Sequence, residues 1–247
     1  MVAPAPGRWH AVGVTAAGFS FDDVSVVVDD GTAILDRVSL ELPARGLTAI
    51  AGPSGSGKST LLRCCNRLEV PSSGRIRLGD DDISTLDPMA LRRRAGMVFQ
   101  RPVVFGGTVH DNFCVARPGV SETEARGVLG QVGLPASLLG RQADDLSGGE
   151  AQRMCIARAL LTGPEILLMD EATSALDVDA RKTVERLATE LLATGITILW
   201  VTHDLEQAER IADHVVVVLA GRVVPPAEAQ RLIARRSFAG LDDGGPV

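Results

Sequence analysis

Residues 52–60 have the types and spacing of a phosphate-binding loop. They fit the pattern Gly-x-x-x-x-Gly-Lys-Ser/Thr and lie between a predicted strand and a predicted helix. The glycines let the backbone curl so that successive N–H groups face one concavity, and the following helix adds its positive N-terminal end. Lys58 supplies a charge for the β- and γ-phosphates, and Ser59 offers a hydroxyl to Mg²⁺. A nucleoside triphosphate site is therefore predicted, with the members Gly52, Pro53, Ser54, Gly55, Ser56, Gly57, Lys58, Ser59 and Thr60.

Two carboxylates follow the apolar run Ile166–Met169. A strand buried by helices cannot hold bare charges in its middle, so Asp170 and Glu171 should lie at its C-terminal end, where ligands of open α/β sheets bind. Asp170 is expected to hold Mg²⁺, directly or through water. Glu171 is expected to face the γ-phosphate and to orient or deprotonate the attacking water. A helix N-cap is the alternative interpretation of such an acidic pair.

Gln100 and His203 each follow another predicted strand and should reach the same sheet edge. His203 can contact the γ-phosphate as a hydrogen-bond donor, although a lone histidine after a strand is more often structural. Gln100 ends the predicted strand Met97–Phe99 and offers its amide to the metal or to the water. We therefore predict Gln100, Glu171 and His203 as catalytic residues. The metal-site candidates are Ser59, Gln100 and Asp170.

A second glycine-rich segment, Leu146–Glu150, precedes the predicted helix Ala151–Leu161. A serine and paired glycines at a helix N-terminus make a second anion-binding end. The chain has only one loop of the Lys58 type, so this second end is predicted to serve the nucleotide of a neighbouring subunit. Ser147, Gly148 and Gly149 therefore point to a dimer.

The elements around these motifs predict an α/β fold with a mostly parallel sheet. Alternating and β-branched runs over residues 19–42, split by a turn signal at 29–31, predict an N-terminal antiparallel hairpin that Gly74–Leu78 could join. Short apolar strands alternating with amphipathic helices predict a parallel sheet covered on both faces. Helices are predicted over Lys58–Leu68, from Asp87-Pro88 to near Gly96, over Ser121–Val132 and over Val178–Ala193.

Glycine and proline breaks between Gln100 and Ser147 predict a small helical subdomain, at about residues 101–160. We expect one folded domain over residues 19–240, a flexible leader over residues 1–18 and a flexible tail over residues 241–247.

Composition and charge argue against several classes of protein. The 247 residues carry 25 basic and 31 acidic side chains, a net charge of −6, so no nucleic-acid partner is expected. The longest apolar runs, Ile196–Val201 and Val215–Ala220, are far shorter than the roughly 20 residues that span a bilayer. We therefore expect neither an integral membrane protein nor a secreted one. The four cysteines lack metal-ligand spacing and are expected to be reduced, packed thiols.

The motifs, taken in chain order, resemble those of the ATP-binding cassette (ABC) ATPases over about residues 20–224. They are Gly52–Thr60, Gln100, Leu146–Glu150, Ile166–Glu171, Ser174–Asp177 and His203. The resemblance implies a P-loop NTPase core, ATP and Mg²⁺, and a homodimer of cassettes packed head to tail around two ATP molecules. Each ATP would contact Lys58 and Ser59 of one protomer. Ser147 and Gly149 of the other protomer would complete the site, and Asp177 would lie in the loop that crosses the interface.

The same resemblance implies a subunit that energises a separate integral membrane permease. The helical lobe and the segment after Gln100 would grip that permease and hold the chain on the cytoplasmic face of the membrane. Val98–Asn112 looks exporter-like, and Gly133–Pro135 and Leu199–Asp204 are similar to segments of small metal (iron) exporter cassettes. Phosphate and amino-acid importer cassettes share many of these features and are the alternative. A soluble cassette that acts in DNA repair or translation is a further alternative.

One position departs from the family pattern. The family usually stacks adenine on an aromatic residue at the end of the first strand pair, where this chain has Val28, and the chain contains no tyrosine. Either Val28 makes a plain apolar contact with the base, or Phe19, Phe21 or Trp9 replaces the missing ring. An aromatic stack contributes about 1 kcal/mol beyond area burial. We therefore expect weaker selectivity for adenine, with binding retained.

Overall fold

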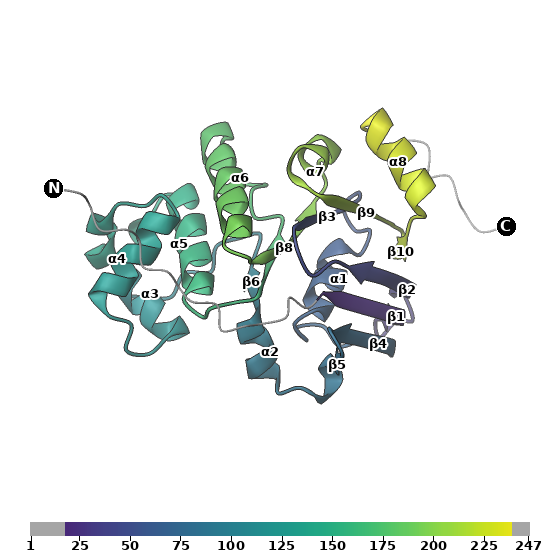
Figure 1. Ribbon diagram of the computed structural model, residues 1–247, viewed down its shortest axis with the longest axis horizontal. Helices are drawn as coiled ribbons and strands as arrows, with labels where there is room; N and C mark the ends of the chain where they lie inside the picture. The colour runs from purple at the N-terminus through teal and green to yellow at the C-terminus, as the bar shows by residue number, and fades with distance from the viewer. Residues whose placement is uncertain (1–17, 239–247) are drawn as a thin grey trace.

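Two β-sheets and a group of helices make up the computed structural model, which describes residues 18–238 (Figure 1). The expected tail, nearly all of the expected leader and Trp9 lie outside the described residues. Within residues 18–238, no helix is long and apolar enough to cross a membrane.

The N-terminal sheet has four strands in the order β2-β1-β4-β5. Strands β1 (Phe19–Val27) and β2 (Ala33–Leu42) form the predicted antiparallel hairpin. Gly31 has a φ of +86° in the connecting turn, a conformation that glycine adopts at low cost. β4 (Ser73–Leu78) pairs with the free edge of β1, and β5 (Asp81–Asp82) pairs with β4. The N-terminal antiparallel subdomain is thus confirmed.

The central sheet has six strands in the order β10-β9-β3-β8-β7-β6, and all but β10 are parallel. They are β3 (Leu47–Ala51), β6 (Ala95–Val98), β7 (Ile166–Asp170), β8 (Thr197–Thr202), β9 (His214–Leu219) and β10 (Arg222–Val223). Every residue of β3, β7 and β8 is buried, which is why these strands are continuous apolar runs. The predicted α/β class with a mostly parallel sheet is confirmed.

Helices cover both faces of the central sheet. The helices of the described residues are α1 (Lys58–Cys64), α2 (Pro88–Arg94), α3 (Val109–Ala116), α4 (Glu122–Gln131), α5 (Gly148–Leu160), α6 (Val178–Ala193), α7 (Leu205–Ile211) and α8 (Pro226–Arg235), with short 3₁₀ turns at Ile83–Thr85, Ala136–Gly140 and Ala143–Asp145. Alternate residues of one strand enter different cores, as the pleat requires. Met169 and Trp200 pack in the core shared with α5, α6 and α7, whereas Leu168 and Val201 pack with α1 and the antiparallel sheet.

Helices α3, α4 and α5 pack on one another, with the 3₁₀ turn Ala136–Gly140 against α3 and α4, at the left of Figure 1. Side-chain caps start all three helices. Thr108, Ser121 and Ser147 each form a capping box with the acidic residue three positions later. These helices lie within the expected helical subdomain, whose boundaries stay a prediction.

The structure differs from the sequence-based expectation at several helices. The helix predicted over Lys58–Leu68 ends at Cys64 because Arg67 takes a φ of +55°, which no helix accommodates. The sequence pattern does not predict α3 or α8. Thr108 before α3 and Pro226 in the first turn of α8 are the local signals that mark these starts.

None of the four cysteines forms a disulfide, as expected. Cys64, Cys65 and Cys155 are buried, and Cys114 is partly buried. Burial, with a smaller contribution from Glu69, raises the pKa of the Cys64 thiol to about 12. The Cys64 thiol is therefore a packing group that stays protonated at neutral pH.

Candidate functional site

The loop from Gly52 to Gly57 joins the end of β3 to the start of α1, as its spacing predicts. Gly55 and Gly57 have φ values of +79° and +101°, in the left-handed region where glycine is favoured. A Cβ at Gly57 would also lie 2.7 Å from the carbonyl oxygen of Ile34, so this position excludes any side chain. The backbone therefore curls before the helix and leaves its first amides unpaired, as a phosphate-binding loop requires.

Two polar side chains of this loop, Ser56 and Lys58, are buried and have few hydrogen-bond partners. Lys58 is only 4% exposed, and its Nζ donates to the carbonyl oxygen of Pro53 at 2.7 Å. Burial lowers the pKa of Lys58, whereas the carboxylates of Glu171 and Asp170 raise it. Ser56 Oγ is buried and has no hydrogen-bond partner among residues 18–238. A buried ammonium and an orphaned hydroxyl beside unpaired amides fit a phosphate chain.

Asp170 lies at the end of β7 and is 2% exposed, so its charge must be paired to be tolerated there. The hydroxyl of Ser59 donates to its Oδ1 at 2.6 Å, and Nη2 of Arg63 donates to its Oδ2 at 3.1 Å. The structure thus brings two of the predicted Mg²⁺ ligands together. A hydroxyl and a carboxylate oxygen are donors that suit this hard cation.

Sequence reasoning missed Arg63. The residue lies four positions after Ser59 on α1, so the two side chains share one helix face and can reach the same carboxylate. That spacing, combined with the expectation that Asp170 is buried, is the signal that could have found the ion pair.

Glu171 is the meeting point of the predicted catalytic residues. Its Oε2 accepts a hydrogen bond from Nε2 of Gln100 at 3.2 Å and lies 3.3 Å from Nδ1 of His203. An ionised carboxylate can only accept, so the proton of this contact belongs to His203 Nδ1. Gln100 also donates to Ser174 Oγ at 3.2 Å, a neighbour that the sequence did not indicate. In these contacts Gln100 meets neither Ser59 nor Asp170, and its metal role stays a prediction.

The backbone of Glu171 holds a conformation that the sequence does not reveal. Its φ is +45°, in the left-handed region that few residues other than glycine adopt. Its amide donates to the carbonyl of Val201 at 3.2 Å, and its carbonyl accepts from the amide of Ser174 at 3.0 Å. The residue is thus fixed on both sides in a conformation that costs of order 1 kcal/mol or more.

Ser147, Gly148, Gly149 and Asp177 line a separate groove of about 560 Å³ between the starts of α5 and α6. The Ser147 hydroxyl is occupied in its capping box with Glu150, and Asp177 accepts from the amide of Ala180 at 2.8 Å. No hydrogen bond or ion pair in the described part of the chain joins these residues to Gly52–Thr60. Figure 1 shows α5 and α1 well apart.

The residues considered for an adenine contact differ in exposure. Phe19 and Phe21 are 2% and 4% exposed and pack in the core under the antiparallel sheet, so the expectation that either replaces the missing ring is wrong. Val28 follows β1 in the hairpin turn and is 44% exposed. A plain apolar contact through Val28 stays a prediction.

Comparisons with known proteins agree with this site. The family model described as "ABC transporter" matches residues 35–174. The "ABC transporter I family member 17" of Arabidopsis thaliana is 40% identical over 229 residues, which are 88% of this chain and 86% of that protein. The "Phosphate import ATP-binding protein PstB 2" of Mycobacterium tuberculosis is 38% identical over 250 residues, covering 94% and 90% of the two chains.

A solved structure is similar over most of the fold. It is a dimeric, post-hydrolysis state of an ATP-binding cassette bound to ADP and Pi. Its TM-score is 0.74 at 27% identity, and the match covers 84% of this chain and 97% of that one.

The contact between Arg63 and Asp170 should contribute to stability. Replacing Arg63 with Met leaves the buried carboxylate with one neutral donor. We expect the free energy of unfolding to fall by about 1–2 kcal/mol. The loss should lie near the lower end of this range, because Arg63 is 44% exposed and water screens its charge. Urea denaturation of R63M, D170N and the double variant measures the coupling. Equal losses from R63M in both backgrounds would show that the pair contributes nothing. R93M, which removes an exposed arginine of α2, is the matched control.

Proposed function

This chain belongs to the ABC transporter family, and we propose that it uses the site above to bind and hydrolyse ATP and thereby to energise a separate membrane permease. It is an ABC-type ATPase subunit of a transporter. The observation that carries the proposal is the convergence of Gln100 and His203 on Glu171, next to the Lys58 loop and Asp170.

The loop residues Gly52–Thr60 bind the phosphates of ATP in this proposal. Unpaired amides and the positive end of α1 face the negative oxygens, and Lys58 exchanges its bond with the Pro53 carbonyl for one with the nucleotide. Because Lys58 is buried, its charge acts in a poorly screened environment and is worth more than the same charge in water.

Ser59, Asp170 and Gln100 hold Mg²⁺ in this proposal. The bound ion supplies positive charge that neutralises the oxygens of the terminal phosphates. Asp170 keeps Arg63 as a partner on its second oxygen, so its carboxylate stays oriented toward Ser59.

Glu171 acts on the attacking water. Two donors, Gln100 Nε2 and His203 Nδ1, contact its Oε2 and hold the carboxylate in one orientation. An ionised, oriented carboxylate accepts a hydrogen bond from the water and then its proton. We infer that His203 and Gln100 lie beside the γ-phosphate, and that each would exchange a donor now bonded to Glu171 or Ser174 for one to the phosphate oxygens as their charge grows.

A second copy of the chain completes each site. Ser147, Gly148, Gly149 and Asp177 lie in a groove that makes no polar contact with the chain's own phosphate-binding loop, so they are free to face a partner. Val178, beside Asp177, is a large apolar side chain that is 66% exposed, which supports an interface at this surface. We infer a homodimer of cassettes with ATP at the interface.

The membrane subunit binds the surface after Gln100, and the domain division expected from the sequence fits this role. Val103 and Phe105 of the segment before α3 and Val115 of α3 are large apolar side chains that are 42–59% exposed. Exposed apolar groups gathered in one stretch of chain are typical of a protein interface. We infer that residues 101–160 form the helical subdomain that grips the permease, which places the chain on the cytoplasmic face of the membrane.

Two solutes fit the family. The exporter-like segment Val98–Asn112 favours metal (iron) export. A relative that covers nearly the whole chain is named as a phosphate import protein, which favours phosphate import as the second candidate. Transport of labelled iron or phosphate into inverted and right-side-out vesicles separates the two.

Replacing Glu171 with Gln keeps the shape of the side chain and removes its basicity. We expect the variant to bind Mg-ATP as the wild type does, to hydrolyse it at least about 100-fold more slowly, and to accumulate as a dimer in size-exclusion chromatography with ATP. E41Q changes an exposed carboxylate of β2 and should behave as the wild type. Near-normal turnover of E171Q would remove Glu171 from the role of general base.

The absence of an aromatic ring at Val28 should relax selectivity for adenine. We expect GTP to compete with ATP for the wild-type site, and V28Y to raise the preference for ATP about fivefold, since an aromatic stack contributes about 1 kcal/mol. Competition titrations with a fluorescent ATP analogue measure both. V27Y, at the neighbouring last residue of β1 and with equal exposure, is the control. A strong preference of the wild type for ATP would contradict the expectation.

Charge on the surface after Gln100 should separate hydrolysis from membrane attachment. We expect the double variant V103D/V115D to keep the basal ATPase activity of the purified chain and to lose co-purification with a polytopic membrane protein from detergent-solubilised membranes of the native cell. V70D introduces the same charge at a 65% exposed valine outside this segment and should still co-purify. Retention of the membrane protein by V103D/V115D would place its contact elsewhere.

A further inference from the structure

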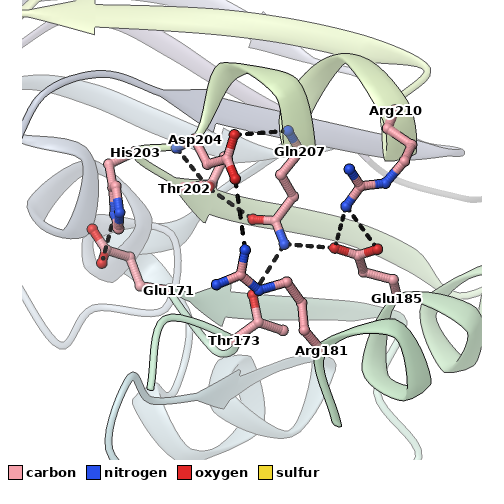
Figure 2. Close-up of polar contacts among 9 residues, drawn as sticks. All are labelled: Glu171, Thr173, Arg181, Glu185, Thr202, His203, Asp204, Gln207 and Arg210. Atoms are coloured by element: carbon pink, nitrogen blue, oxygen red, sulfur yellow. Dashed lines mark hydrogen bonds and ion pairs between the residues drawn. The ribbon is translucent and has the colours of Figure 1, made fainter. Parts of the chain in front are cut away.

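A buried polar cluster lies beside Glu171 and His203 (Figure 2). At its centre is the side chain of Gln207, which projects from α7 and is 3% exposed. The residues hydrogen-bonded to its side chain are Thr173, Glu185 and Thr202, which are all buried or nearly so.

The amide of Gln207 uses all its donors. Its Nε2 donates to Thr173 Oγ1 at 3.1 Å and to Glu185 Oε1 at 2.8 Å, and its Oε1 accepts from Thr202 Oγ1 at 2.8 Å. A primary amide offers two N–H donors and a carbonyl acceptor, which is the combination that these three partners need. A leucine would remove one hydrogen bond from each of these three groups, and a glutamate would bring a second carboxylate against Glu185.

The three partners belong to the three segments that carry the proposed machinery. Thr173 lies two residues after Glu171, and Thr202 immediately precedes His203. Glu185 lies on α6, the helix that Asp177 caps. One side chain therefore links the segment of the general base, the segment of the histidine and the helix that starts at the dimer groove.

Arg210 holds Glu185 in place, and the cluster shares a cavity with Glu171. Arg210 Nη2 donates to both carboxylate oxygens of Glu185, at 2.7 and 2.9 Å. A cavity of about 290 Å³ is lined by Gln207 together with Glu171, Thr173, Thr202 and His203. A change in the bonds of Gln207 therefore shifts residues that share this cavity with Glu171.

We propose that Gln207 is a positioning residue for ATP hydrolysis, which sets the placement of Glu171 and His203 relative to each other and to α6 through its three hydrogen bonds. Misplacement of reacting groups by about 1 Å can cost about 100-fold in rate. Binding of the phosphates depends on the loop around Lys58, to which Gln207 makes no contact. The rate of the chemical step should therefore depend on Gln207 while nucleotide affinity does not. This inference rests on the proposed function.

The variant Gln207→Glu tests the proposal through its pH dependence. The introduced carboxylate has no N–H for Thr173 or Glu185, so we expect kcat to fall by about tenfold or more, with KM for ATP changed by less than about twofold. Burial and the neighbouring Glu185 raise the pKa of the introduced carboxyl, and only its protonated form can donate to Glu185. The ratio of variant to wild-type kcat should therefore rise as the pH is lowered from about 8 to about 6.

Several charged and titratable groups face residue 207 and can influence the pH dependence of kcat. They are Arg181 and Glu185 from α6, Asp204 and Arg210 from α7 and its cap, and Glu171 and His203 from the ends of β7 and β8. All six are present in the wild type, so the ratio of the two rates isolates the added carboxyl.

Two further variants keep the test decisive if Gln207→Glu fails to fold. Thr202→Val removes the hydroxyl that donates to Gln207 and accepts from the amide of Asp204, and should lower kcat in the same direction. The exchange Glu185→Gln with Gln207→Glu restores an amide opposite a carboxylate with the net charge unchanged, and should recover a large part of the kcat lost in Gln207→Glu. Gln131→Glu, at an exposed residue at the end of α4, is the matched control and should match the wild type.

The outcomes separate this inference from the proposed function. An inactive wild type that fails to bind ATP would overturn the proposed function. An active wild type, with folded Gln207→Glu or Thr202→Val keeping its kcat and its pH profile, would overturn the positioning role alone. A raised KM at unchanged kcat would also overturn it, because it would place Gln207 in nucleotide binding.

Discussion

A buried carboxylate persists only where it is paired, and Asp170 is the residue on which this constraint acts most strongly. β7 is buried on both faces, so its charges can lie only at its end, and even there Asp170 is 2% exposed. Ser59 and Arg63 of α1 satisfy its two oxygens. The same pairing fixes α1 against β7 and so sets the phosphate-binding loop beside the carboxyl ends of the strands. Glu171, Gln100 and His203 follow strands that end at the same edge, so they lie near this loop.

Networks of polar side chains connect this edge of the sheet to the interior of the protein. Gln100 and His203 reach Glu171 directly, and Gln207 links the segments behind it to α6. Satisfied buried polar groups are costly to disturb and specify one arrangement of the chain. The Glu171 carboxylate is thus held directly by Gln100 and His203, and the segments that carry Glu171 and His203 are linked through Gln207. Through Glu185 the network also includes α6, whose first turn is capped by Asp177 at the groove; in the proposed dimer this would connect the hydrolysis site to the partner subunit.

Sequence patterns predict those parts of the fold that depend on local rules. Buried strands are apolar runs, so both ends of Leu47–Ala51 are predicted correctly, and the predicted bounds of the helix Val178–Ala193 agree with α6. The spacing of Gly52–Thr60 predicts the loop because only glycine tolerates its backbone. The pairing of Arg63 with Asp170, the φ of Glu171 and the cluster around Gln207 join distant segments, and their contacts depend on packing that no local pattern encodes. Phe19 and Phe21 show the same limit, since their burial decides that they cannot contact a nucleotide.

The central claim is that Ser147, Gly149 and Asp177 serve the nucleotide of a partner, so that one chain alone lacks half of its catalytic site. Steady-state ATP hydrolysis per chain, measured across protein concentrations while light scattering reports the oligomeric state, tests this most directly. The account predicts that activity per chain falls toward zero as dilution makes the protein monomeric, and that it recovers on concentration. Full activity per chain in a strictly monomeric sample would contradict it.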